Sequence, residues 1–219
     1  SDCINLTSIN VSNFNTSNVT EMGGMFFNCQ SLISLNVSNF DTSKVAFMGY
    51  MFNKCYSLTS LDLSNFNTSK GTGMNDMFSY CIALTSLNVS NFDTSNVTGM
   101  VNMFNICNSL TTLDLSNFNT SKVTNMGYMF SDCIKLTSIN VSSFDTSNVT
   151  AMVAMFEGCS TLTSLNISSF DTSKVTNMGM FFRCEKLITV YVKDENTKTK
   201  IVKTDDLMPN CTIIVGAPT

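Results

Sequence analysis

The spacing of the cysteines constrains this chain more than any other feature. Cysteine recurs every 26 residues from Cys3 to Cys159, and once more at Cys184 after 25 residues. Each interval carries the pattern CxxLTSLNVSNFDTSKVTxMxxMFxx, and seven copies run from Cys3 to Arg183. A fixed period of roughly 20 to 50 residues is typical of structural units that stack along one axis. The spacing therefore predicts a solenoid, in which each repeat forms one coil.

Within each repeat, the pattern predicts a short strand, a turn and a short helix. Residues 110–115 end in alternating apolar and polar residues, which is typical of a half-buried strand. The Asn/Asp-Thr-Ser segment that follows is rich in turn-forming residues. Apolar residues then recur at i, i+3, i+4 and i+7, which predicts one face of a helix that begins at Thr124. In this copy they are Met126, Met129, Phe130 and Cys133.

The expected architecture is an α/β solenoid of about eight coils, with one short strand and one short helix per 26-residue coil. Residues 1–184 hold the seven repeats, the last of which is one residue short. Residues 185–219 read as a degenerate last repeat and a C-terminal cap, because a terminal coil needs a polar outer face. They lose the Met/Phe pattern and contain two strand-like runs, at 190–192 and 212–215. Since the chain begins in the middle of a repeat, further repeats or an N-terminal cap are expected to precede it in the full protein.

The LxxLxV segment joined to MFxxCxxL resembles BspA-like leucine-rich repeat proteins and the related 26-residue repeats of bacterial surface proteins. The likeness covers about 190 residues, and Met103, Phe104, Cys107 and Leu110 show the motif. It implies a leucine-rich-repeat-like solenoid on cell-surface or secreted proteins that take part in adhesion and partner binding. One departure is a Phe where such repeats usually have an Asn, which implies an aromatic spine in place of an Asn hydrogen-bond ladder. These residues are Phe14, Phe40, Phe66, Phe92, Phe118, Phe144 and Phe170.

Composition argues against several classes of function. The chain has no His and no Trp, which excludes His-dependent triads and His-ligated zinc sites. Only 13% of residues are charged and the net charge is −4, which disfavours nucleic-acid binding. No apolar run approaches the roughly 18 residues of a membrane span, so no membrane insertion by this segment is expected. We expect no catalytic residue, no cofactor and no metal site, and hence a protein that is not an enzyme.

The nine cysteines do not change that expectation. A structural metal site needs thiolates that converge on one point, whereas cysteines one coil apart lie along a line, spaced by about 5 Å. The cysteine ladder is therefore expected to consist of reduced, buried thiols that fill the core.

The outward positions of the predicted strands form the candidate binding face. Each coil repeats Ser/Thr, Asn/Asp and Ser there, so the side chains would form rows along the stack. The candidate residues are Ser34, Asn36, Ser38, Ser60, Asp62, Ser64, Ser86, Asn88, Ser90, Thr112, Asp114, Ser116, Ser138, Asn140 and Ser142. Small polar residues of this kind also simply keep a strand face soluble.

The expected function is that of an extracellular or cell-surface repeat module, whose signal and anchor lie outside this segment. It would bind a protein or glycan of a host or neighbouring cell. Two alternatives remain open. The segment could be a rigid spacer that displays another domain, or its regular rows could bind a lattice such as polysaccharide or ice.

Overall fold

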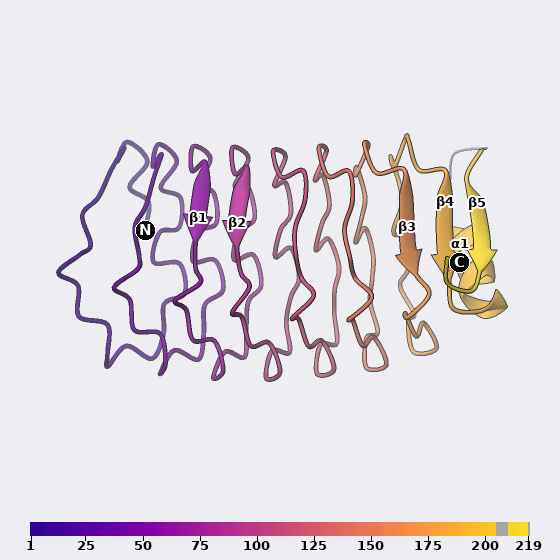
Figure 1. The fold of residues 1–219 in the computed structure, drawn as a ribbon, viewed down its shortest axis with the longest axis horizontal. Coiled ribbons are helices and arrows are strands. Elements are labelled where there is room, and N and C mark those ends of the chain that lie inside the picture. The colour runs from indigo at the N-terminus through magenta and orange to yellow at the C-terminus, as the bar shows by residue number, and fades with distance from the viewer. Residues whose placement is uncertain (205–209, 219) are drawn as a thin grey trace.

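The computed structural model describes residues 1–204 and 210–218, and it consists of coils that lie side by side along one axis (Figure 1). Its helix and strands are β1 (Ser60–Asp62), β2 (Ser86–Asn88), β3 (Ser164–Ile167), β4 (Thr189–Val192), α1 (Glu195–Thr204) and β5 (Thr212–Val215). β1 pairs with β2, and β3, β4 and β5 form a second sheet, all in parallel. The register joins Ser60 to Ser86 and Ser164 to Thr189, one repeat apart. The chain is therefore a repeat protein with a solenoid-like stack of short parallel strands.

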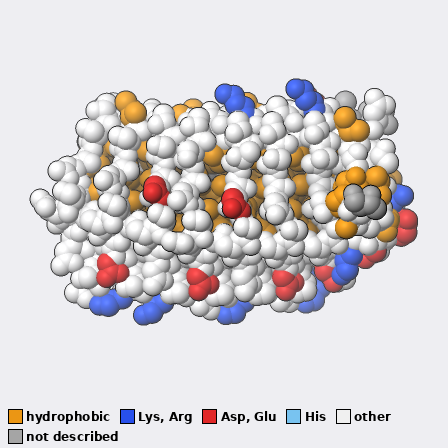
Figure 2. Space-filling view, in the orientation of Figure 1, with side chains coloured by type: hydrophobic (Ala, Val, Ile, Leu, Met, Phe, Trp, Pro, Cys, Tyr) orange, Lys and Arg blue, Asp and Glu red, His pale blue; other side chains and the backbone are white. Residues whose placement is uncertain are grey.

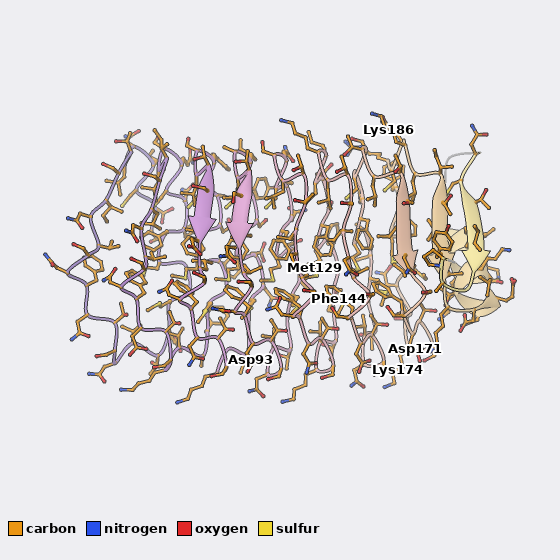
Figure 3. All side chains as sticks on the ribbon, in the orientation of Figure 1. Asp93, Met129, Phe144, Asp171, Lys174 and Lys186 are labelled. Atoms are coloured by element: carbon orange, nitrogen blue, oxygen red, sulfur yellow. The ribbon has the colours of Figure 1, made fainter. Side chains whose placement is uncertain are left out.

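The core runs through the whole stack rather than lying in one central layer. Met126, Met129 and Phe130 of the fifth repeat and the Cys133 that follows are all buried, and the other repeats bury the same positions apart from Met25, which is half-buried. Figure 3 shows Met129 inside the stack, together with Phe144. Each coil thus covers the apolar side chains of its neighbour, which explains why a single repeat could not be stable by itself.

The helix predicted in each repeat is absent from residues 3–184, all of which the structure describes, so that prediction was wrong. The Met126–Cys133 segment consists of two successive turns instead. The N–H of Met129 donates to the carbonyl of Met126 (3.3 Å), and the N–H of Cys133 donates to that of Phe130 (3.2 Å). Two linked turns place apolar residues at the same spacing as a helical face, so the sequence pattern could not distinguish between them.

Left-handed residues prevent these turns from joining into a helix. Tyr128 and Asp132 have φ angles of 58° and 54°, a conformation that interrupts a right-handed helix. Their N–H groups point to the next coil, where they donate to the carbonyls of Val153 (2.9 Å) and Glu157 (2.6 Å). The hydrogen bonds between coils have replaced those that a helix would have made within itself.

The coils are joined more regularly on one side than on the other. We call the side formed by residues 126–133 and their equivalents the turn side, and that formed by 34–38, 60–64 and their equivalents the strand side. β-bridges continue from coil to coil beside the turns, from Glu21 to Asn177. The strand side forms sheets only at β1–β2 and β3–β5 among the described residues, so the prediction of a strand in every coil was only partly right.

Two ladders of phenylalanine run along the stack, and the sequence identified the looser one. In the expected spine, Phe92 stacks on Phe118 and Phe144 on Phe170, with ring centroids 6.4 Å apart, while Phe14 is exposed. The Phe that follows Met in each repeat forms a closer and unbroken stack, with neighbouring centroids 5.4 to 6.0 Å apart. This second ladder consists of Phe26, Phe52, Phe78, Phe104, Phe130, Phe156 and Phe181.

The expected loss of an asparagine hydrogen-bond ladder is only partly right. Asparagines stand one position before the spine Phe from Asn39 to Asn117, whereas Ser143 and Ser169 stand there in the last two repeats. The Nδ2 of Asn65, just before a spine Phe, donates to the carbonyls of Val37, Ser38 and Phe40 in the preceding coil, at 3.1 to 3.2 Å. Asparagine amides thus satisfy backbone carbonyls beside the aromatic rings.

The buried threonine of each Asn/Asp-Thr-Ser segment also joins neighbouring coils. From the sequence, this segment was predicted only to form a turn. The Oγ1 of Thr94 donates to the carbonyl of Asn119 (2.9 Å), and the N–H of Asn119 donates back to Oγ1 (2.8 Å). Thr42 and Thr120 make the same donation to Asn67 and Asp145, at 3.0 and 2.8 Å. One hydroxyl therefore satisfies two backbone groups that would otherwise be unpaired in the interior.

The one-residue deletion in the seventh repeat shortens the turn side without shifting the core. Gly179 takes a φ of 86°, and the carbonyl of Met180 still accepts the N–H of Phe156 (3.0 Å). Phe181 remains buried and stacks on Phe156, with centroids 6.0 Å apart.

The C-terminal residues close the stack with an element that the sequence did not reveal. β4 and β5 match the two expected strand-like runs, but α1 lies between them and was missed. The buried Thr197 of α1 places its Oγ1 2.9 Å from the Oγ1 of Thr172, and Lys200 Nζ donates to the carbonyl of Val175 (3.1 Å). α1 thus supplies the partners that another coil would have provided. Only Thr197 and Ile201 are buried in it, which explains its weak apolar periodicity.

Candidate functional site

The residues of the predicted binding face lie together in an exposed band along the strand side. Ser64 and Asn88 are half-buried, and all the others are exposed. Figure 2 views this side and shows few charged side chains on it, with most Lys and Arg along the two edges. The sequence thus predicted correctly that these side chains face solvent in rows, which leaves their role as a separate question.

The central residue of each polar triplet is partly engaged in holding the backbone. Asn36 Oδ1 accepts the N–H of Ser38 (3.0 Å), and Asp62 Oδ1 accepts the N–H of Ser64 (3.0 Å) and the Nδ2 of Asn88 (3.0 Å). The N–H and hydroxyl of Ser64 lower the pKa of Asp62. The amide and carboxylate rows therefore have a structural role whether or not a partner binds.

A groove opens on this side where the coils are not paired as strands. It has a volume of about 340 Å³ and lies between residues 34–38 and β1. Its polar lining residues are Ser34, Asn36, Ser38, Ser60, Asp62, Ser64 and Asn65. Six of these seven belong to the predicted binding face, so the structure brings together the part of that face that lies nearest the N-terminus.

Charges at the lower edge of the strand side are paired with neighbours one coil away. Asp171 forms an ion pair with Lys193 (3.1 Å), while Lys174 donates to Asn148 Oδ1 (2.9 Å). Hydrogen bonds from Ser173 and the ion pair with Lys193 hold the pKa of Asp171 well below its usual range. Figure 3 shows Asp93, Asp171 and Lys174 along this edge, and Lys186 on the opposite one. These charges help to join the coils.

A second hollow lies on the turn side, and the sequence analysis did not predict it. It has a volume of about 400 Å³ and spans several coils. Its lining residues are Asp76, Ser79, Tyr80, Asn102, Asn105, Ile106, Tyr128, Ser131, Asp132 and Glu157. All of them occupy the variable positions of MxxMFxxC, which the repeat pattern leaves open. The presence of Tyr, Asp and Asn at those variable positions was the sequence feature that could have indicated this hollow.

The cysteine ladder lies in the core. Cys29 to Cys159 are free and buried, and Cys184 is also buried, whereas Cys3 is exposed and Cys211 is half-buried. The thiol of Cys81 donates to the carbonyl of Phe52 (3.2 Å). Burial raises the pKa of Cys133 to about 12, so this thiol is protonated at neutral pH. Within residues 1–204 and 210–218, no three Cys, Asp or Glu side chains converge as metal ligands would.

No helix in the described part of the chain has the length and apolar character needed to cross a membrane.

Comparison with known proteins places the chain in a family. No curated protein matches it significantly. No solved structure matches it significantly. One family, described as "Mycoplasma protein of unknown function, DUF285", matches twice, over residues 1–109 and 81–190. Together the two matches cover the repeats and continue into β4, so the chain belongs to the DUF285 family of repeat proteins.

Proposed function

We propose that this chain is a non-enzymatic binding module of a bacterial cell-surface or secreted protein. In this proposal it is a leucine-rich-repeat solenoid of the BspA-like kind, and it mediates adhesion by holding an extended protein or glycan along its strand side. The observation that carries the proposal is the groove between residues 34–38 and β1, which lies within the exposed polar band.

The groove suits a polar, extended partner better than a compact apolar one. Ser34, Asn36 and Ser60 are exposed around it, and they offer hydroxyl and amide groups in rows one coil apart. Asn65 Nδ2 binds the carbonyls of Val37 and Ser38, and β1 is paired with β2, so the protein loses little conformational entropy when a partner binds. A partner with its own repeat, such as a polysaccharide, could engage several coils and gain avidity.

A blocking experiment tests this proposal. The double variant Ser34→Lys/Ser60→Lys places two long side chains in the groove, and Ser57→Lys/Ala83→Lys adds the same charge on adjacent coils outside it. The control is well matched, because the equivalent positions in other coils already carry Lys135 and Lys186. Arrays of glycans, mucins and matrix proteins would be probed with the wild type and both variants.

Adhesion through the strand side predicts one saturable partner whose binding falls at least about tenfold in the groove variant only. Equal binding by both variants would place the partner elsewhere. Absence of any partner would favour the spacer alternative. Affinity that increases with the number of repeats, for a polymer but not for its monomer, would favour lattice recognition.

A further inference from the structure

The residues that line the hollow on the turn side vary from repeat to repeat more than those of the strand side do. Its walls come from the left-handed corners of successive coils, among them Asp76, Asn102, Tyr128 and Asp132, with φ angles between 54° and 58°. These corners direct side chains outward while the N–H groups of the turns bind the next coil. The chain can therefore vary these residues without disturbing the stack, which makes them suitable for recognition.

The floor of the hollow is polar and fixed. Ser79 and Ser131 are almost completely buried, and Asn105 lies between them. Ser79 Oγ and Asn105 Oδ1 are 3.4 Å apart, and Asn105 Nδ2 lies 3.4 Å from the carbonyl of Ser131. These small side chains leave space between the walls, and their backbone is held by the ladder of the turn side.

The charge of the hollow has one sign. Three carboxylates line it, those of Asp76, Asp132 and Glu157, and its lining contains no Lys or Arg. Arg183 approaches Asp132 from outside the lining at 3.5 Å, and both side chains remain partly exposed. The hollow therefore keeps an excess of negative charge that one surface ion pair does not neutralise.

Asp76 is a carboxylate of the hollow whose partners are all neutral. It is half-buried, and its hydrogen-bond partners are the neutral side chains of Asn102 and Tyr50. Burial raises its pKa, because a charged carboxylate has lost water there without gaining a cation. A positively charged group in the hollow would supply the missing interaction.

Aromatic rings complete the site. Tyr80 and Tyr128 line the hollow and keep 37% and 41% of their surface exposed. Large exposed aromatic rings beside carboxylates attract organic cations through both charge and the ring quadrupole. A bare metal ion fits less well, because the carboxylates do not converge as three ligands.

From this arrangement we propose that the turn-side hollow, at Asp76, Tyr80, Tyr128 and Glu157, binds an organic cation. The ligand group is an ammonium or guanidinium, carried either by a small amine or by a basic side chain of a peptide. Its charge would lie against a tyrosine ring and one of the two carboxylates, because coils about 5 Å apart keep Asp76 and Glu157 from contacting the same ammonium. This site is separate from the strand-side groove and does not depend on it.

The test uses the whole 219-residue chain and two probes, agmatine and tetralysine, followed by NMR chemical-shift titration. We expect saturable shifts at turn-side residues, and an affinity that falls when salt is raised. The variant Asp76→Asn/Glu157→Gln should weaken binding at least about tenfold, and Tyr128→Leu by about threefold. Asn is compatible with the backbone at position 76, because Asn102 occupies the equivalent corner with a φ of 57°.

The matched control is Asp62→Asn/Asp114→Asn, which removes the same charge from the strand side. It should change the dissociation constant by less than about twofold. Saturation by agmatine would identify a small amine as sufficient, and saturation by tetralysine alone would identify a peptide side chain. Shifts that do not saturate by about 50 mM of either probe, or equal losses in the two double variants, would overturn the proposal. Neither result would bear on adhesion through the strand side.

Discussion

The strand side and the turn side of this protein use the same 26-residue period in opposite ways. On the strand side, Ser, Thr, Asn and Asp recur in register from coil to coil, and most of the surface is uncharged (Figure 2). On the turn side, the left-handed corners vary among Gly, Tyr, Asp, Asn and Ala from coil to coil. Their residues are Gly24, Tyr50, Asp76, Asn102, Tyr128, Ala154 and Gly179.

The side with the more varied side chains has the more regular backbone pairing between coils. β-bridges connect successive coils along the turn side without a break from Glu21 to Asn177, whereas the strand side pairs only in two patches within the described residues. A backbone that is fully bonded to its neighbours can carry varied side chains. Under the two proposals above, partner specificity would therefore depend more on the turn side, and repetitive contact more on the strand side.

The largest test of this comparison replaces one phenylalanine in each ladder. Phe104→Ala removes a buried ring from the close stack beside the turns, and we expect it to lower the free energy of unfolding by about 4 kcal/mol. Phe118→Ala, in the looser spine, should cost about 1 kcal/mol less. Equilibrium denaturation in urea measures both values. Equal losses would mean that ring spacing does not reflect how strongly the two sides are joined.

A smaller effect is expected from the buried threonines. Thr94→Val keeps the shape of the side chain but leaves the N–H and carbonyl of Asn119 unpaired, which should cost about 2 kcal/mol. Thr98→Val is the control, because its exposed hydroxyl makes one bond to the carbonyl of Thr72, which water can replace. It should cost less than about 0.5 kcal/mol. If both variants unfold at the same urea concentration, the buried ladder does not join the coils as proposed.

The left-handed corners predict a stabilising substitution on the turn side. Ile106 has a φ of 58°, which a β-branched residue adopts only with strain, whereas Asn tolerates it. Ile106→Asn should raise the free energy of unfolding by about 1 kcal/mol. Ile33→Asn serves as the control, because Ile33 is exposed and its φ is not positive. A stabilisation common to both variants would reflect the loss of exposed apolar surface rather than relief of strain.

The smallest effect is the dependence of stability on pH, to which a carboxylate on the strand side and one on the turn side should contribute with opposite sign. Hydrogen bonds from Ser116 lower the pKa of Asp114 on the strand side, whereas burial raises the pKa of Asp76 on the turn side. Ionised Asp114 therefore stabilises the fold above the ordinary aspartate pKa, and this contribution is lost as pH falls. Asp76 behaves in the opposite way, because its protonation on acidification relieves the cost of its burial. Carboxyl NMR titration should find Asp114 below and Asp76 above the value of about 3.9 for a free side chain.

Much of the fold could be predicted because the repeat is nearly exact. The period predicted stacked coils, and the burial of Cys107, Met126 and Phe130 in each coil followed from their fixed positions. The helix prediction failed because Met126 to Cys133 satisfies a helical spacing as well as two linked turns. What differs between these structures is where the N–H groups go, and that depends on the neighbouring coil.

For the candidate sites too, some features followed from the sequence and others depended on the tertiary structure. The sequence alone determined the period, the buried ladders and the polar rows of the strand side, because each depends only on which residue types recur. Tertiary structure decided that the coils separate beside β1, that α1 closes the last coil, and that variable residues from several coils line one hollow. Asp76 and Glu157 are 81 positions apart in the chain, and only the stacking of coils through backbone hydrogen bonds brings such residues to one site.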